Sequence, residues 1–154
     1  LETVASVSAL VRQTRESINA NVDSSVTEYI NSNNNINPRE ISKIVIREAK
    51  KGDKLAYRVI LAICESLGNI IAELSSILCP ELIVIGGCIS ESGDLLLNTI
   101  GQKIRSEGDV SIADKTEIKI SQLGDQSTIL GAGRTVINNF FQSYERFIKQ
   151  LNIK

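Results

Sequence analysis

Apolar residues recur along this chain at the two spacings that distinguish helices from strands. Spacings of three and four residues predict five helices, each beginning beside a residue type that commonly caps a helix start. These predicted helices cover about residues 6–18, 38–51, 54–78, 90–106 and 126–151. The third is the longest strongly apolar helix, and its apolar positions sweep a broad face.

Two short runs with different patterns predict strands. Residues 82–85 are all apolar and mostly β-branched, which predicts a strand buried on both faces, as in parallel sheets. Residues 116–123 alternate, with Ile118 and Ile120 on one face, and predict a half-buried strand. Strands that alternate with helices in this way are typical of the α/β class. Because two strands are few for a stable sheet, we expect further strands to come from outside this chain.

Turn chemistry marks the boundaries of the central helices. Asn37, Pro38 and Glu40 combine a cap residue, a proline at the first helical position and a glutamate three residues after the cap. Gly52 then ends this helix, and Asp53 caps the next one.

One segment shows neither periodicity. Residues 19–37 are polar and rich in asparagine, which predicts an exposed loop, with a short helix over residues 25–30 as the alternative. With this loop included, the sequence predicts a single domain over residues 1–154, long enough to bury a sizeable core.

Composition and charge narrow the class of protein. A net charge of −1 and an aromatic content of 4% argue against a nucleic-acid interface within this chain. No uninterrupted apolar run approaches the roughly 20 residues that span a bilayer, and no secretory signal precedes the first helix. We therefore expect a cytoplasmic protein without a membrane partner. The sequence contains no methionine, so we also expect it to be a fragment of a longer protein.

The cysteines carry no metal signature. Cys64, Cys79 and Cys88 fit no zinc-binding spacing, and the sequence contains no histidine. Their odd number favours free thiols in a reducing compartment, mostly buried as small apolar groups. Cys88 stands beside a glycine pair and is the thiol whose reactivity we would test first.

Two glycine clusters are the candidate binding residues. Gly86 and Gly87 follow the first strand, where backbone N–H groups could face a phosphate or a nucleotide ring; the alternative is a tight turn without a ligand. The second cluster, residues 123–128 with 131–133, follows the second strand, so both clusters could flank one crevice. For the glycines in the last helix, close helix packing and approach to a ligand are equally good explanations.

The chain lacks the residues of a catalytic centre. Three Gly-Asp pairs invite interpretation as catalytic bases, but Asp53, Asp109 and Asp125 all suit cap or turn roles better. Without histidine, paired cysteines or a serine-nucleophile motif, we predict no catalytic residue here.

Several blocks, in register, resemble the ROK family (repressors, open reading frames, kinases). The matching blocks are residues 1–6 (LETVAS), 49–56 (AKKGDKLA), 67–72 (LGNIIA), 79–90 (CPELIVIGGCIS), 121–124 (SQLG) and 130–133 (LGAG). The resemblance implies an α/β fold, the helix-rich C-terminal lobe of an actin-like, RNase H-like ATPase with a small, partly parallel sheet.

The resemblance also implies roles for individual residues. Glu2 matches the last residue of the family's zinc motif, where it contacts the sugar. Gly86 and Gly87 would face the nucleotide, and Gly131 with Ala132 would lie near the adenosine. The chain itself would hold no cofactor; zinc, and ATP with magnesium in kinase members, would be bound by upstream parts of the full protein. The implied partners are a carbohydrate, other copies of the chain, and DNA only through an absent N-terminal domain.

Two residues depart from patterns common in the family, and the first of them favours the regulator branch. Kinase members often have Ser-Gly where this chain has Ser6-Val7, and Cys88 stands where many members have a third glycine. We therefore expect a sugar-sensing and oligomerising part of a transcriptional regulator, with the C-terminal part of an ATP-dependent sugar kinase as the alternative. On either interpretation we expect the isolated chain to be enzymatically inactive.

Overall fold

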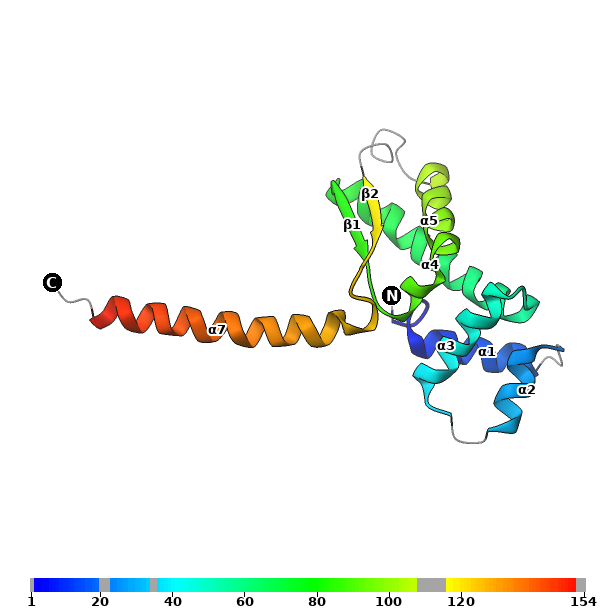
Figure 1. Ribbon diagram of the computed structural model, residues 1–154. Helices are drawn as coiled ribbons and strands as arrows, with labels where there is room; N and C mark the ends of the chain where they lie inside the picture. The colour runs from blue at the N-terminus through cyan, green and yellow to red at the C-terminus, as the bar shows by residue number, and fades with distance from the viewer. Residues whose placement is uncertain (1, 20–22, 34–35, 108–115, 152–154) are drawn as a thin grey trace.

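The computed structural model describes residues 2–19, 23–33, 36–107 and 116–151 (Figure 1). The elements in order are α1 (Val7–Asn19), α2 (Ser25–Ser32), α3 (Pro38–Lys50), α4 (Lys54–Leu78), β1 (Leu82–Ile85), the 3₁₀ helix η1 (Cys88–Ser92), α5 (Asp94–Glu107), β2 (Glu117–Ile120), the 3₁₀ helix η2 (Gly124–Gln126) and α7 (Ser127–Leu151). This helix-rich α/β architecture confirms the class expected from the sequence.

The two strands form a small parallel sheet. Ile83 pairs with Ile118 and Ile85 pairs with Ile120, and these four side chains face the helices. The helix α5 connects the strands and packs beside α4, so the strands and the helix form a βαβ unit (Figure 1). Because the strands run parallel, the glycine turn after β1 and the turn after β2 lie at the same edge of the sheet.

The core is built around α4. This helix packs against α1, α3 and α5, and its buried side is almost entirely apolar. The largest fully buried side chains come from four helices: Leu10, Ile41, Ile60, Ile63, Leu96 and Ile100. By length and composition alone, α4 could cross a membrane, but half of its most apolar stretch is buried inside the protein. Its apolarity is therefore explained by its place in the core.

Capping residues end and begin the helices as predicted. The side chain of Asn37 accepts a hydrogen bond from the Arg39 amide, and that of Asp53 accepts one from the Ala56 amide. Gly52, with φ of +93°, makes the turn between α3 and α4. The end of α4 is less expected, because Cys79 adopts a left-handed conformation with φ of +46°.

The segment predicted as an exposed loop contains a packed helix. The helix α2 occupies residues 25–32, where the sequence offered a short helix as the alternative. Its Val26 is completely buried in the core cluster, so the segment is not wholly exposed.

Two predictions of burial are wrong, and one apolar helix lies exposed. The strand β1 is buried on one face only, because Leu82 and Val84 point away from the helices and are 47% and 57% exposed. Cys79 is exposed rather than buried. The helix α7 projects away from the rest of the molecule (Figure 1), and its large apolar side chains within residues 129–141, including Ile129 and Phe140, are exposed.

Candidate functional site

The first glycine cluster and the beginning of the second lie together at the edge of the sheet. Gly86 follows β1 directly, and a Cβ built on it would lie 3.6 Å from the Ser121 Cβ and 3.7 Å from the Ser127 Oγ. Ser121 follows β2, and its amide donates a 2.8 Å hydrogen bond to the Ile85 carbonyl. The carboxyl ends of both strands therefore lie side by side.

Gly87 has a conformation that other residues rarely adopt. Its φ is +81° and its ψ is −174°. A Cβ built on Gly87 would have no neighbouring heavy atom within 4 Å. Its carbonyl accepts hydrogen bonds from the Ser90 amide and from the Ser90 hydroxyl, the latter at 2.6 Å. The turn is therefore fixed on the η1 side and open on the other.

A groove of about 440 Å³ lies on this open side. We call it the Gly86–Gly87 groove. Its lining comes from the N-terminal segment, α1, α3, α4, the turn after β1 and the first turn of α7: Glu2, Ala5, Ser6, Val7, Ser8, Leu10, Arg39, Ile63, Gly86, Gly87, Cys88, Ile89 and Thr128. The structure thus brings Glu2, the predicted sugar contact, to the same groove as both predicted nucleotide-facing glycines.

A short hydrogen-bonded turn positions Glu2. The Ser6 hydroxyl donates to the Glu2 carbonyl and accepts a 3.1 Å hydrogen bond from the Ala9 amide, so Ser6 joins the turn to the start of α1. Arg12 donates a 2.8 Å hydrogen bond to the Thr3 carbonyl and holds the same segment. Glu2 itself is exposed, and its carboxylate is accessible to a solute in the groove.

Other predicted residues lie outside this groove or outside the described structure. Gly131 and Ala132 are exposed on α7 and do not line the groove. The side chain of Asp125 lies outside the described residues, as does all of Asp109. Asp53 has the cap role that was predicted for it.

Sequence reasoning missed two polar contributors to the groove. Arg39 lies between the named residues of the helix-start motif and was not assigned to a site, and Thr128 was noted only as part of the second glycine cluster. The place of Thr128 in that cluster was the one available signal. Arg39 comes from α3, which no local motif connects to the end of a strand.

The lining determines what the groove can bind. It offers one carboxylate, one guanidinium and several hydroxyl groups above an apolar base, a set suited to a small polyhydroxylated or anionic molecule. Among the described residues, no cluster of three or more His, Cys, Asp or Glu side chains could hold a metal ion. The described part of the groove therefore has the chemistry of a binding site.

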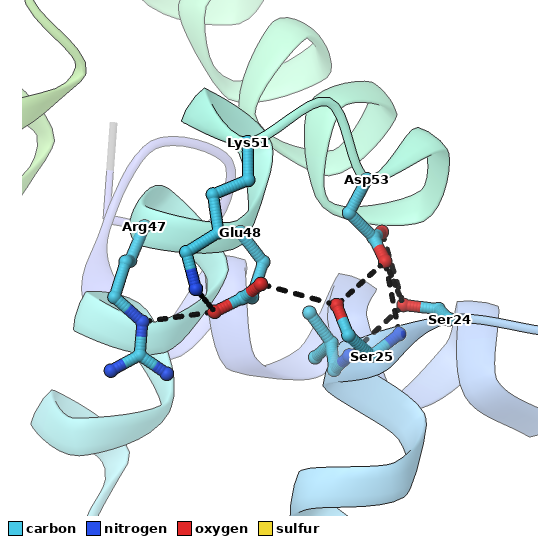
Figure 2. A network of polar contacts seen from close by, with 7 residues as sticks. Ser24, Ser25, Arg47, Glu48, Lys51 and Asp53 are labelled. Atoms are coloured by element: carbon cyan, nitrogen blue, oxygen red, sulfur yellow. Dashed lines mark hydrogen bonds and ion pairs between the residues drawn. The ribbon is translucent and has the colours of Figure 1, made fainter.

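A second polar cluster joins α2 to the turn between α3 and α4 (Figure 2). Both oxygens of Asp53 accept hydrogen bonds from the Ser24 hydroxyl, at 3.0 and 2.9 Å. Asp53 also accepts from the amide and the hydroxyl of Ser25, each at 3.0 Å. Burial alone raises the pKa of Asp53, but the hydrogen bonds from Ala56, Ser24 and Ser25 outweigh it and leave the pKa lowered.

Glu48 completes this cluster from α3. Its carboxylate accepts a hydrogen bond from Lys51 and one from Arg47, both at 2.9 Å, and one from the Ser25 hydroxyl at 3.2 Å (Figure 2). The hydrogen bonds from Lys51 and Arg47 lower the pKa of Glu48. Every acid in the cluster is thus hydrogen-bonded, and the arrangement serves to dock α2.

Comparison with known proteins identifies the family. The sequence matches the ROK family over residues 1–138. It is 32% identical over 133 residues to a glucokinase of Halalkalibacterium halodurans, a match that covers 86% of this chain and 39% of that protein. It is 28% identical over 139 residues to a xylose repressor of Caldicellulosiruptor bescii, covering 90% of this chain and 34% of that protein.

Solved structures show the same two branches. A ROK family transcriptional regulator, a homologue of the Escherichia coli Mlc protein, superposes with a TM-score of 0.70 at 30% identity, over 85% of this chain and 31% of that one. A ROK family glucokinase from Streptomyces griseus, solved with glucose and AMPPNP, superposes with a TM-score of 0.61 at 25% identity. The match covers 85% of this chain and 42% of that one. The chain spans about a third of the length of these relatives. The family match, the shared fold and the expected sequence blocks agree, and the chain belongs to the ROK family.

Proposed function

We propose that this chain is the carbohydrate-responsive part of a ROK-family transcriptional regulator. The Gly86–Gly87 groove is its share of the effector site. The observation that carries the proposal is the meeting of Glu2, Gly86 and Gly87 at one groove. The family resemblance gives Glu2 the role of a sugar contact and places Gly86 and Gly87 in a turn that faces the nucleotide. Glu2 and the two glycines come from distant parts of the chain.

The role of Glu2 is that of a hydrogen-bond acceptor for sugar hydroxyls. A carboxylate accepts from two adjacent hydroxyls at once, and such charge-assisted hydrogen bonds are among the stronger polar contacts. Ser8 and Thr128 add neutral donors and acceptors around the same groove, and the partly buried Val7 and Ile89 supply an apolar surface for the sugar ring.

Two residues of the groove favour a regulator over a kinase. Val7 departs from the kinase pattern, Cys88 departs from a pattern common to many family members, and both line the groove. Each places a side chain where those members have glycine, so each occupies space beside the turn that would face a nucleotide. Both side chains therefore lie at the same groove, and they argue against close contact between the glycine turn and a phosphate group.

The C-terminal part of an ATP-dependent sugar kinase is the second candidate. The 32% identity to a glucokinase supports it, as does the fold shared with a glucokinase solved with glucose and AMPPNP. In that case Gly86 and Gly87 face the nucleotide, and Gly131 and Ala132 lie near its adenosine.

Further partners follow from the family resemblance and belong to the same proposal. The protein is cytoplasmic and acts as a homo-oligomer. Zinc, and ATP with magnesium in the kinase alternative, would be held by other parts of the protein, since the described residues offer no metal cluster. DNA would be bound by a separate N-terminal domain.

Calorimetric titration of the protein from its complete native reading frame tests the effector site. We expect glucose or xylose to bind, and Glu2→Gln to weaken that binding at least tenfold, because an amide replaces one charged acceptor by a donor. The matched control is Glu28→Gln, an exposed glutamate of α2 away from the groove. Equal affinities for both variants would contradict the proposed role of Glu2.

A coupled assay for ADP release separates the two candidate functions. If the protein is a regulator, we expect no sugar-dependent ADP release by the native protein. We also expect its affinity for DNA to change when the sugar is added. Sugar-dependent ADP release at an enzymatic rate would establish the kinase instead.

A further inference from the structure

We propose that a second, apolar cavity between α3, α4 and the end of η1 binds a small ligand. The ligand would have about the size of a single ring and would carry one hydrogen-bonding group that contacts the Ser92 hydroxyl. This site is separate from the Gly86–Gly87 groove, and the inference does not depend on the function proposed for that groove.

The cavity has a mostly apolar wall. Its volume is about 180 Å³, and its wall includes Ile46 and Ala49 of α3, Ile60 of α4 and Leu95 of α5. Ile46 and Ile60 are almost completely buried, at 2% and 1% exposure. The wall therefore belongs to the core of the protein, and a ligand bound there would be largely withdrawn from water.

The polar feature of this cavity is a buried hydroxyl. Ser92 ends η1, lines the cavity and is 7% exposed, and its hydroxyl has no hydrogen-bond partner among the described residues. The oxygen itself is buried, so a ligand would reach it after the side chain rotates about χ1. A buried hydroxyl without a partner costs about 1–3 kcal/mol. Such an orphaned group in a native fold calls for a partner, and the adjoining cavity has room for one.

Water is a poor partner for this hydroxyl. A buried water molecule typically makes about three hydrogen bonds, whereas the wall around Ser92 is mainly aliphatic. A molecule with an apolar body and one polar group satisfies Ser92 and fills the remaining volume. An engineered cavity of about 150 Å³ holds benzene, so a single ring is the appropriate size.

The ligand would enter on the side of Lys50 and Tyr57. Both residues line the cavity and also reach solvent, and Tyr57 is 43% exposed. The aromatic ring of Tyr57 offers further apolar contact area at this opening.

Phenol and toluene are the matched probes for this site. They share a ring and nearly the same volume, but only phenol carries a hydroxyl. We expect phenol to bind in an NMR titration with shift changes at Ile60, Ser92 and Leu95, and to bind about three- to tenfold more tightly than toluene. Shift changes confined to other residues would overturn the proposal.

Three variants make the test specific. Ser92→Ala should abolish the preference for phenol over toluene, and the variant should fold because it removes an unsatisfied polar group. Ala49→Leu should weaken both probes by filling the cavity. Ser75→Ala is the control, since Ser75 is also buried with an unpartnered hydroxyl but does not line this cavity. A preference that persists in Ser92→Ala, or disappears in Ser75→Ala, would refute the inference.

Discussion

Replacing Asp53 by alanine should destabilise the protein more than any other single change in the polar cluster at α2. Asp53 caps α4 through the Ala56 amide at 2.9 Å. It also accepts hydrogen bonds from Ser24 and from both the amide and the hydroxyl of Ser25. One carboxylate therefore holds the starts of two helices, and its removal leaves donors of both without their partner.

The magnitude follows from these contacts. Loss of a helix cap costs about 1 kcal/mol, and loss of a hydrogen bond to a charged group costs about 1.5–3 kcal/mol. The Ser24 oxygen still accepts from the Val26 amide, and the Ser25 hydroxyl still reaches Glu48, so part of the second loss is recovered. We therefore expect a decrease of about 2–3 kcal/mol in the free energy of unfolding. For a chain of this size, that corresponds to a decrease of about 4–12 °C in Tm.

The pH dependence gives this prediction a second readout. The folded-state pKa of Asp53 is lowered from its usual 3.8, so its charged form is the one that the fold stabilises. This contribution is complete above the unfolded-state pKa and is lost as pH falls through the lower folded-state pKa. The difference in stability between the native protein and Asp53→Ala should thus be constant near neutral pH and shrink below about pH 4.

Thermal unfolding followed by circular dichroism measures both effects. Asp23→Ala is the matched control, because Asp23 is an exposed carboxylate beside the same cluster. Asp53→Asn should fall between the native protein and Asp53→Ala, since asparagine caps helices about as well as aspartate but carries no charge. If Asp53→Ala melts within about 1 °C of Asp23→Ala, the cluster does not stabilise α2 as reasoned here.

Three further predictions concern single residues. Gly87→Ala should lower the free energy of unfolding by about 1–3 kcal/mol, because the backbone there has a φ of +81°. Gly131→Ala, on exposed α7, should raise it by about 0.5–1 kcal/mol, because alanine favours a helix over glycine. Chemical unfolding measures both, and the opposite order would contradict these backbone assignments. Thiol labelling at pH 8 with mass spectrometry should modify exposed Cys79 quickly and Cys64 only after unfolding, because burial raises the pKa of Cys64 to about 12. In residues 1–154 expressed alone, Phe140→Ser should change the unfolding free energy by less than about 0.5 kcal/mol, since Phe140 is 68% exposed; a larger loss would show that Phe140 is buried in that chain in solution.

Local chemistry was sufficient to predict most of the secondary structure. Asn37 and Asp53 are caps that act through their own side chains on amides two or three residues away, so no long-range information was needed to place α3 and α4. The alternation at Ile118 and Ile120 likewise depends only on the strand geometry. The packing of α2 was harder to predict, because it depends on Asp53 and Glu48, which come from other elements.

The groove was only partly predictable for the same reason. Gly86 and Gly87 stand at the end of a recognisable strand, and the parallel pairing brings the turn after β2 beside them. Arg39 reaches the groove from α3, whose position is set by the packing of its apolar face on α4. A local motif has no information about that packing, which is why the polar lining from outside the strand ends was missed.

The errors in predicted burial point to contact surfaces. A β-branched run such as Leu82–Ile85 is characteristic of strands covered on both faces, yet Leu82 and Val84 are exposed, as is Phe140 on α7. Apolar faces of this extent are typical of surfaces that other protein segments cover, and the chain spans about a third of its relatives' length. The first turn of α7 lines the Gly86–Gly87 groove through Thr128, and the helix continues outward from there (Figure 1). The described large apolar residues along it are exposed. A segment packed along α7 would therefore begin at the edge of the groove, where the presence of a ligand can affect how that segment packs.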